Sequence, residues 1–156
     1  RVRPGPEGTE AVGHRRDGTP VPALDTGGFT AAGAVRATPL DMLTFLEAHT
    51  AGAGLGGPES TGPGLTGPTL AAALAEVRRP VLRRGLRHTH THTLTWFHHP
   101  SPYGPVLFHA GATLGQQAFL GFRPDSGLAV AATATRRVHR ADTFVATAYG
   151  LLTETP

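Results

Sequence analysis

Histidines alternate with threonines over residues 88–92, and two more histidines follow at positions 98 and 99. Side chains two residues apart on a β-strand share one face at a spacing of about 6.8 Å. An expected strand over 89–99 would therefore carry His90, His92 and His98 on one face, together with Leu94 and Trp96. Imidazole is a zinc ligand, but no carboxylate lies nearby in the sequence to orient these rings. We keep a histidine-strand metal binder as an alternative and expect no metal site and no cofactor.

His109 is the second candidate for chemistry. It ends the apolar run 106–109 and precedes Ala110, Gly111 and Ala112. A histidine in this place is also compatible with a half-buried residue at the end of a strand. The sequence has no cysteine, no carboxylate pair, no phosphate-binding glycine loop and no Gly-x-Ser-x-Gly motif. These absences argue against a cysteine nucleophile, acid–base catalysis by two carboxylates, a phosphate-binding loop and the nucleophile turn of α/β-hydrolases.

Charge does not favour a nucleic-acid partner. The chain has 14 basic and 11 acidic residues, and every basic residue is arginine. Five arginines gather over residues 78–87 without an aromatic residue to stack on bases, whereas nucleic-acid-binding surfaces combine the two. No apolar run approaches the roughly 20 residues that cross a bilayer, so we expect no transmembrane segment in this chain.

The elements that position these residues predict an α+β fold, an antiparallel sheet flanked by helices. Three β-compatible runs, 106–109, 117–122 and 128–135, are separated by glycine-rich turns. Thr38 is an expected helix N-cap, with Pro39 as the first helical residue and Asp41 returning a hydrogen bond. The expected segments are a mostly irregular stretch over 1–37, a helix over 38–50, a flexible loop over 51–68, a helix over 69–78, strands within 88–135 and a C-terminal helix over 140–152.

Several of these segments together resemble the C-terminal portion of the serine β-lactamases and penicillin-binding-protein-like hydrolases, in the class C or AmpC-related branch. The resemblance rests on His109-Ala-Gly with a returning strand and a Pro-Asp-x-Gly turn over 124–127, on residues 13–22 followed by 32–46, and on Leu94-Thr-Trp96, which is similar to the family's Gly-Leu-x-Trp strand. The resemblance implies a partial β-lactamase or transpeptidase-like fold over residues 1–156.

The resemblance also implies roles for the residues after the apolar run. His109 to Ala112 stand where the family has its third motif, Lys-Thr-Gly or His-x-Gly, on the strand that borders the active site. Small residues at Ala110 and Gly111 would let substrate lie against the backbone. The backbone N–H of Ala112 would contribute to an oxyanion hole. His109 would donate a hydrogen bond or positive charge, and its replacement of lysine favours esters, amides or peptides over dedicated antibiotic hydrolysis.

The family's nucleophile and base lie on a Ser-x-x-Lys helix, and a Tyr-x-Asn loop supplies a further catalytic oxygen. Neither motif occurs in this sequence, which contains no lysine. We therefore expect the nucleophile to lie in a missing N-terminal segment of the same protein and this chain to be inactive alone. The family suggests a secreted or cell-envelope location, although no signal peptide is visible and the sequence does not define the location.

The sequence thus predicts part of a serine hydrolase that cleaves an ester, amide or β-lactam through an acyl-enzyme. The expected partner is a small-molecule or peptide substrate, with His109 and Ala112 as catalytic residues and Ala110 and Gly111 as substrate-binding residues. A non-catalytic binding module or hydrolase relic is the alternative, together with the metal-binding strand.

Overall fold

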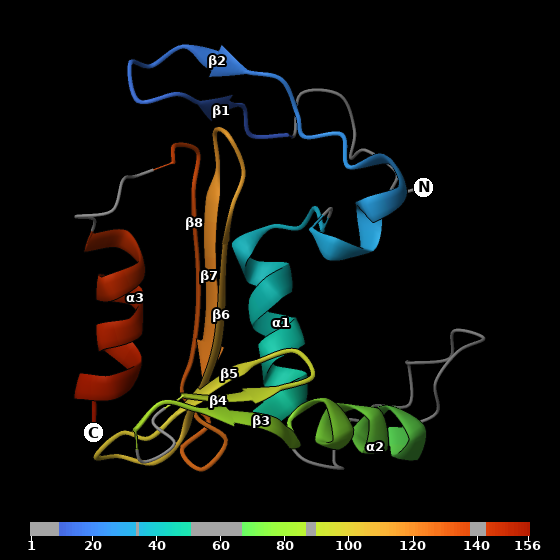
Figure 1. Ribbon diagram of the computed structural model, residues 1–156, viewed down its shortest axis with the longest axis vertical. Coiled ribbons are helices and arrows are strands. Elements are labelled where there is room, and N and C mark those ends of the chain that lie inside the picture. Colours follow the sequence, from blue (N-terminus) through green and yellow to red (C-terminus); the bar gives the residue numbers. More distant parts are fainter. Residues whose placement is uncertain (1–9, 34, 51–66, 87–89, 138–142) are drawn as a thin grey trace.

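The centre of the fold is a six-stranded antiparallel sheet. The computed structural model describes residues 10–33, 35–50, 67–86, 90–137 and 143–156. The strands follow one another in the sheet in chain order: β3 (Pro80–Arg84), β4 (His90–Thr93), β5 (Phe97–His99), β6 (Val106–Ala112), β7 (Gln117–Phe122) and β8 (Ala129–Ala134). The long strands β6, β7 and β8 stand side by side, and β3, β4 and β5 lie across their lower end (Figure 1).

Helices cover the two faces of the long strands. One face carries α1 (Pro39–Thr50), and the other carries α3 (Thr143–Glu154) (Figure 1). Helix α2 (Gly67–Val77) follows α1 in the chain and lies near the foot of the sheet. This arrangement confirms the α+β fold expected from the sequence. Among the described residues, no helix is both long enough and apolar enough to cross a bilayer.

Helix α1 begins where its sequence predicts. The Thr38 hydroxyl accepts a hydrogen bond from the Asp41 backbone N–H at 3.1 Å, and the Asp41 carboxylate accepts one from the Thr38 backbone N–H at 2.9 Å. These two bonds form a capping box, which satisfies amide groups that a helix start leaves unpaired. The Thr38 backbone N–H and, at 2.8 Å, the Thr38 hydroxyl both donate to the Asp41 carboxylate and lower its pKa below its ordinary value, with the backbone bond as the largest cause. The cap therefore fixes where α1 starts.

Two separate clusters of apolar side chains form the core. On the α1 face, the buried residues are Leu46, Trp96, Leu107 and Phe122. On the α3 face, they are Val106, Phe119, Ala148 and Leu152. The alternation of side chains along β6 and β7 divides them between the two faces. Burying apolar area contributes roughly 25 cal/mol per Å², so both faces of the sheet contribute to stability.

The expected single strand over 89–99 is wrong. The chain reverses after β4, because the Thr93 N–H donates to the Trp96 carbonyl at 2.8 Å and the Trp96 N–H donates to the Thr93 hydroxyl at 2.7 Å. The segment therefore forms the hairpin β4–β5 instead of one alternating strand. Trp96 lies in this turn and is buried among the α1-face residues.

Other boundaries differ less. The predicted helix over 69–78 starts two residues earlier, at Gly67, and the C-terminal helix runs over Thr143–Glu154. Residues 51–66 of the predicted loop lie outside the described residues. Strand β3 is not predicted by the sequence, and its five residues are all exposed. An exposed edge strand lacks the alternation of apolar and polar residues that identifies half-buried strands.

A short ribbon near the N-terminus crosses the upper end of the sheet. Strands β1 (Gly13–His14) and β2 (Pro20–Val21) pair with each other, and a 3₁₀ helix (Gly27–Ala32) follows them. The His14 N–H donates to the Gly115 carbonyl at 3.0 Å. A Cβ added at Gly115 would lie 2.1 Å from the Val21 side chain. This contact requires glycine and holds the tip of the β6–β7 hairpin.

Arg123 ties the β7–β8 turn to the end of α3. Its side chain is 1% exposed. The guanidinium donates to the carbonyl of Thr155 at 2.8 Å and to that of Pro156 at 3.1 Å. It also lies over the Tyr103 ring, 5.7 Å from the ring centre. Carbonyl oxygens thus solvate a charge whose burial without acceptors would be costly.

Candidate active-site edge

The second half of β6 has an open side. Strand β7 pairs with β6 from Leu107 to Ala112, whereas β5 pairs only with Val106, Leu107 and Phe108. No described strand covers the β5 side of residues 109–112. The candidate motif from His109 to Ala112 therefore lies on a supported strand with one free backbone edge.

The hydrogen-bonding register shows which backbone groups point to this open edge. The Thr113 N–H donates to the Gln116 carbonyl at 2.9 Å, next to the pair Ala112–Gln117. Hydrogen-bonded pairs recur at every second residue of an antiparallel ladder. Gly111 and His109 thus direct their N–H and C=O groups to β7. Ala110 and Ala112 direct theirs to the open side.

The side chains of the motif divide between the two faces. Ala110 packs against the α3-face cluster, so it meets the open edge through its backbone. His109 alternates onto the opposite face and is exposed, with its ring stacked on Phe97 at a centroid distance of 5.7 Å. A Cβ added at Gly111 would meet no described atom within 4 Å. The space beside Gly111 and His109 is therefore open in the described part of the chain.

The turn after Ala112 is held rigidly. The Thr113 hydroxyl accepts hydrogen bonds from the backbone N–H of Gly115 at 3.3 Å and of Gln116 at 3.0 Å. The Gln116 side chain donates to the Ala11 carbonyl at 2.7 Å, which adds to the β1 contact at this tip. A site that binds a developing charge needs such fixed support, and the turn supplies it next to Ala112.

The hairpin β4–β5 changes which histidines meet. His90 and His99 lie opposite each other, with His90 Nδ1 at 3.1 Å from His99 Nε2. His99 Nδ1 lies 3.1 Å from the Tyr149 hydroxyl of α3. His98 alternates to the other face of the hairpin, so the expected common face for His90, His92 and His98 is wrong. Among the described residues, no group of three potential ligands has the geometry to hold a metal, and His88 lies outside them.

Burial and neighbouring charges shift the titration of this region. Burial lowers the pKa of His99 below its ordinary value, and the nearby rings of His90, His98 and His92 lower it further. The pKa of His98 is also lowered, first by burial and then by Arg83. Burial raises the pKa of Tyr149. These directions favour the neutral forms of His98, His99 and Tyr149 near neutral pH.

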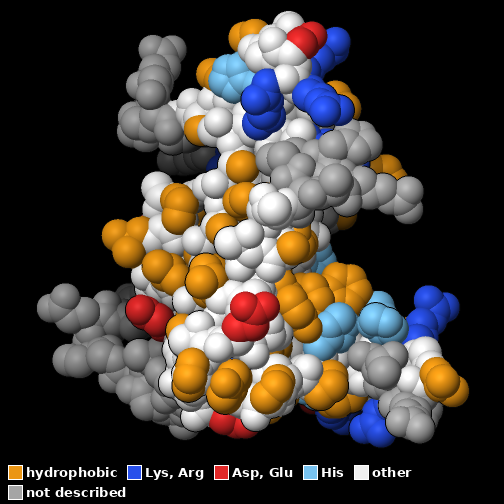
Figure 2. Space-filling model, turned by 90° about the vertical axis from the view of Figure 1, so that its left-hand side faces the viewer, with side chains coloured by type: hydrophobic (Ala, Val, Ile, Leu, Met, Phe, Trp, Pro, Cys, Tyr) orange, Lys and Arg blue, Asp and Glu red, His pale blue; other side chains and the backbone are white. Residues whose placement is uncertain are grey.

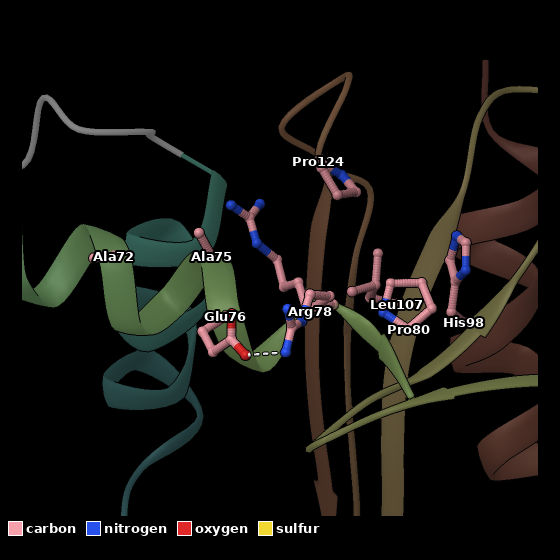
Figure 3. Close-up of a pocket in the computed structure, with 9 residues that line it drawn as sticks. Ala72, Ala75, Glu76, Arg78, Pro80, His98, Leu107 and Pro124 are labelled. Carbon is pink, nitrogen blue, oxygen red and sulfur yellow. Dashed lines mark ion pairs between the residues drawn. The ribbon is translucent and has the colours of Figure 1, made fainter. Parts of the chain in front are cut away.

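A hollow of about 670 Å³ lies between α2 and the sheet. Its lining includes His98, Leu107 and Arg78, the residue that directly follows α2 (Figure 3). Arg78 donates to the His49 carbonyl at 3.0 Å and to the Leu74 carbonyl at 3.2 Å. None of residues 109–112 lines this hollow. The backbone edge and the hollow are therefore separate features, and we place the candidate site at the edge because the motif lies there.

His49 is a buried titratable residue beneath the sheet. It is 2% exposed, and neither ring nitrogen has a hydrogen-bond partner among the described residues. The rings of Trp96 and Phe122 lie 5.2 and 5.1 Å from its ring centre. Burial lowers its pKa from 6.5 to about 4, with a smaller contribution from Arg78. Its spacing after Met42 and Leu46 predicts that His49 lies on the inner face of α1. Nothing in the sequence indicates that its ring nitrogens lack hydrogen-bond partners among the described residues.

Comparison with known proteins identifies the family. Residues 2–154 match the family model described as Beta-lactamase. The chain belongs to the β-lactamase family. The crystal structure of a class C β-lactamase from Rhodobacter sphaeroides has a similar fold, with a TM-score of 0.65 and 18% sequence identity. The match covers 83% of this chain and 41% of that one, so this β-lactamase-family chain spans less than half of that enzyme. A comparison with curated proteins gave no significant match.

Proposed function

We propose that this chain forms one wall of a serine hydrolase active site that cleaves an ester, amide or β-lactam through an acyl-enzyme. Membership of the β-lactamase family supports a relation to serine hydrolases. The nucleophile would come from a Ser-x-x-Lys segment outside this sequence, because the 156 residues contain no lysine. The chain alone would then be inactive, and the missing segment would be its first partner.

The open edge of β6 is the observation that carries this proposal. The Ala112 N–H has no partner in the β6–β7 ladder, and it points to the side where no described strand lies. An amide fixed in this way is suited to stabilise the oxyanion of a tetrahedral intermediate, because it needs no reorganisation as the charge develops. The Ala110 N–H and C=O, two residues earlier, would bind the backbone of a peptide or the amide of a small substrate.

His109 would act beside this edge, next to Phe97. Its imidazole is exposed, and the ring of Phe97 stacks against one side of it. A ring held in this way can donate a hydrogen bond to the substrate or to groups near the nucleophile. Gly111, between these two residues, would leave room for the substrate. In this proposal His109 and Ala112 are catalytic, and Ala110 and Gly111 bind the substrate.

The first test uses the 156-residue chain by itself. We expect no hydrolysis of an activated ester or a chromogenic cephalosporin, and no covalent labelling by a serine-directed phosphonate. Turnover together with labelling would show that the nucleophile lies within this chain and would overturn the assignment. Sequencing the coding DNA upstream of Arg1 is the parallel test. A Ser-x-x-Lys followed by Tyr-x-Asn would support the proposal, and a start codon within a few residues of Arg1 would favour a non-catalytic binding relic.

The second test removes the proposed oxyanion donor from the protein that includes the upstream segment. Ala112→Pro deletes the N–H without breaking a β6–β7 hydrogen bond, and Ala112→Gly keeps the N–H as the matched control. We expect Ala112→Pro to lower kcat by about 10²- to 10³-fold, with KM changed little. An equal loss in both variants, or retained kcat in Ala112→Pro with an unchanged melting temperature, would contradict the role of this amide.

A further inference from the structure

A chain of three side chains joins the hairpin β4–β5 to α3. His90 Nδ1 lies 3.1 Å from His99 Nε2, and His99 Nδ1 lies 3.1 Å from the Tyr149 hydroxyl. This chain lies on the α3 face of the sheet and includes none of residues 109–112. Histidine side chains gather beside hydrophobic ones near the foot of the molecule in this view (Figure 2). The proposed hydrolase function uses none of these three residues.

The spacing of the two imidazole nitrogens fits a shared metal ion. Two nitrogens that each lie about 2.0–2.1 Å from a metal are roughly 2.9 Å apart in square-planar geometry and roughly 3.3 Å apart in tetrahedral geometry. The observed 3.1 Å between His90 Nδ1 and His99 Nε2 lies between these values. A metal placed off the line between the two nitrogens could therefore lie at bonding distance from both, with the proton between the rings released to solvent.

Tyr149 supplies the outer contact that a metal-binding histidine usually has. Such a histidine donates its second ring N–H to an oxygen acceptor, which fixes the ring and leaves the other nitrogen free to bind the metal. The Tyr149 oxygen lies at hydrogen-bonding distance from His99 Nδ1. With the proton on Nδ1, the lone pair of His99 Nε2 is directed to the side where His90 lies.

The site also has room for water ligands. His90 is exposed, and His99 is half-buried. The Phe108 ring packs against His99 at a centroid distance of 4.9 Å and limits its motion. No third ligand among the described residues completes the set, so solvent would fill the remaining positions. Two imidazoles with water suit late divalent transition metals better than Mg²⁺ or Ca²⁺, which prefer oxygen ligands.

We propose that His90 and His99 form a two-histidine site for a late divalent transition metal, with Tyr149 orienting His99. The site differs from the metal-binding strand considered from sequence, where His92 was the neighbour of His90 on one strand. Here the second ligand is His99, which the turn at Thr93–Trp96 brings beside His90. By the usual order of stability, Cu²⁺ binds more tightly than Zn²⁺ at such a nitrogen site.

The experiment is titration calorimetry of the tag-free, chelator-treated protein with Zn²⁺ and then Cu²⁺. We expect one saturable site. His90→Gln and His99→Gln should each weaken Zn²⁺ binding by at least tenfold, and Tyr149→Phe should weaken it on the order of tenfold because His99 loses its orienting partner. His98→Gln is the matched control, because His98 belongs to the same hairpin but faces the other side, and its affinity should change by less than twofold.

A spectroscopic readout separates this site from chance binding to other histidines. Electron paramagnetic resonance of the protein with one equivalent of Cu²⁺ should show coupling to two imidazole nitrogens, and to one fewer in either His90→Gln or His99→Gln. Near-ultraviolet circular dichroism checks that each variant is folded. If no saturable heat appears, or if the folded His90→Gln and His99→Gln variants bind Zn²⁺ as tightly as the parent, the proposal is wrong. Equal weakening by His98→Gln would also overturn it.

Discussion

The two faces of the central sheet are stabilised by different chemistry. The α3-face core is entirely apolar and packs closely, so that a Cβ added at Gly121 would lie 2.5 Å from Leu152 of α3. The α1-face core includes the ring of His49 and the indole nitrogen of Trp96, and in the described part of the chain neither His49 ring nitrogen nor this indole nitrogen has a hydrogen-bond partner. The α3 face therefore depends on shape, whereas the α1 face also depends on keeping a buried imidazole uncharged.

This difference has consequences for the candidate site. Strand β6 contributes side chains to both cores, with Leu107 on the α1 face and Val106 on the α3 face. Loss of either core would move the strand whose far end carries Ala112. Among the described histidines whose pKa is lowered by burial, His49 on the α1 face is the most deeply buried, so acid should act on β6 mainly from that side. Substitutions that overpack the core should act on β6 from the α3 face.

Acidification gives the largest expected difference between the faces. His49 has a folded-state pKa of about 4, against 6.5 ordinarily. As pH falls through 6.5, the unfolded chain takes up a proton that the folded chain does not, so stability is lost between pH 6.5 and 4. The loss attributable to His49 is about 3 kcal/mol. Urea unfolding of His49→Leu should show this part of the pH dependence removed.

The control for this measurement is His109→Leu, which changes an exposed histidine. It should keep the parent's decline in unfolding free energy between pH 7 and pH 4. A His49→Leu variant that declines as steeply as the parent would show that the buried imidazole does not distinguish the α1 face.

Overpacking tests the α3 face. Gly121→Ala places a methyl group against Leu152, Phe108 and Phe119, and we expect a loss of about 1–3 kcal/mol in unfolding free energy because the core must shift. Gly111→Ala is the matched control, since its Cβ would meet open space; its effect should stay within about 0.5 kcal/mol. The measurement is urea unfolding at pH 7.5. Similar losses in both variants would mean that close packing does not distinguish Gly121.

The smallest expected effect comes from the cap of α1. Thr38→Ala removes the hydroxyl that accepts the Asp41 N–H, and losing an N-cap of this kind costs about 1 kcal/mol. Thr38→Ser keeps the hydroxyl and should lie close to the parent. The midpoint of thermal unfolding measures both. If the two variants melt together, the capping box does not control the α1 face.

Much of the fold could be predicted because its signals are local. The runs that form β6, β7 and β8 alternate or are bounded by glycine-rich turns, and the Thr38 cap gives the start of α1 to within one residue. The β4–β5 hairpin could not be predicted in the same way. Its turn depends on the Thr93 hydroxyl and on burial of Trp96. Threonine meanwhile recurs at every second position through the turn, as it would in one uninterrupted strand.

The sequence predicts the motif of the candidate site, but it does not predict which backbone groups of that motif face the open side of the strand. The His109–Ala112 sequence indicated a strand next to an active site only through its resemblance to the family. That Ala110 and Ala112 direct their backbone groups to the open side follows from the length of β5 and the register at Thr113, which are properties of pairing between distant segments. For the same reason, the meeting of His90 with His99 became visible only once the hairpin was known.

Arg123 has a consequence for how the molecule opens. Its buried guanidinium belongs to the β7–β8 turn, while two of its acceptors belong to the residues that follow α3. If α3 lifted from the sheet, it would leave a charge with too few acceptors inside the protein, a costly state. The hairpin and the helix are therefore expected to exchange their amide hydrogens together, as one cooperative unit.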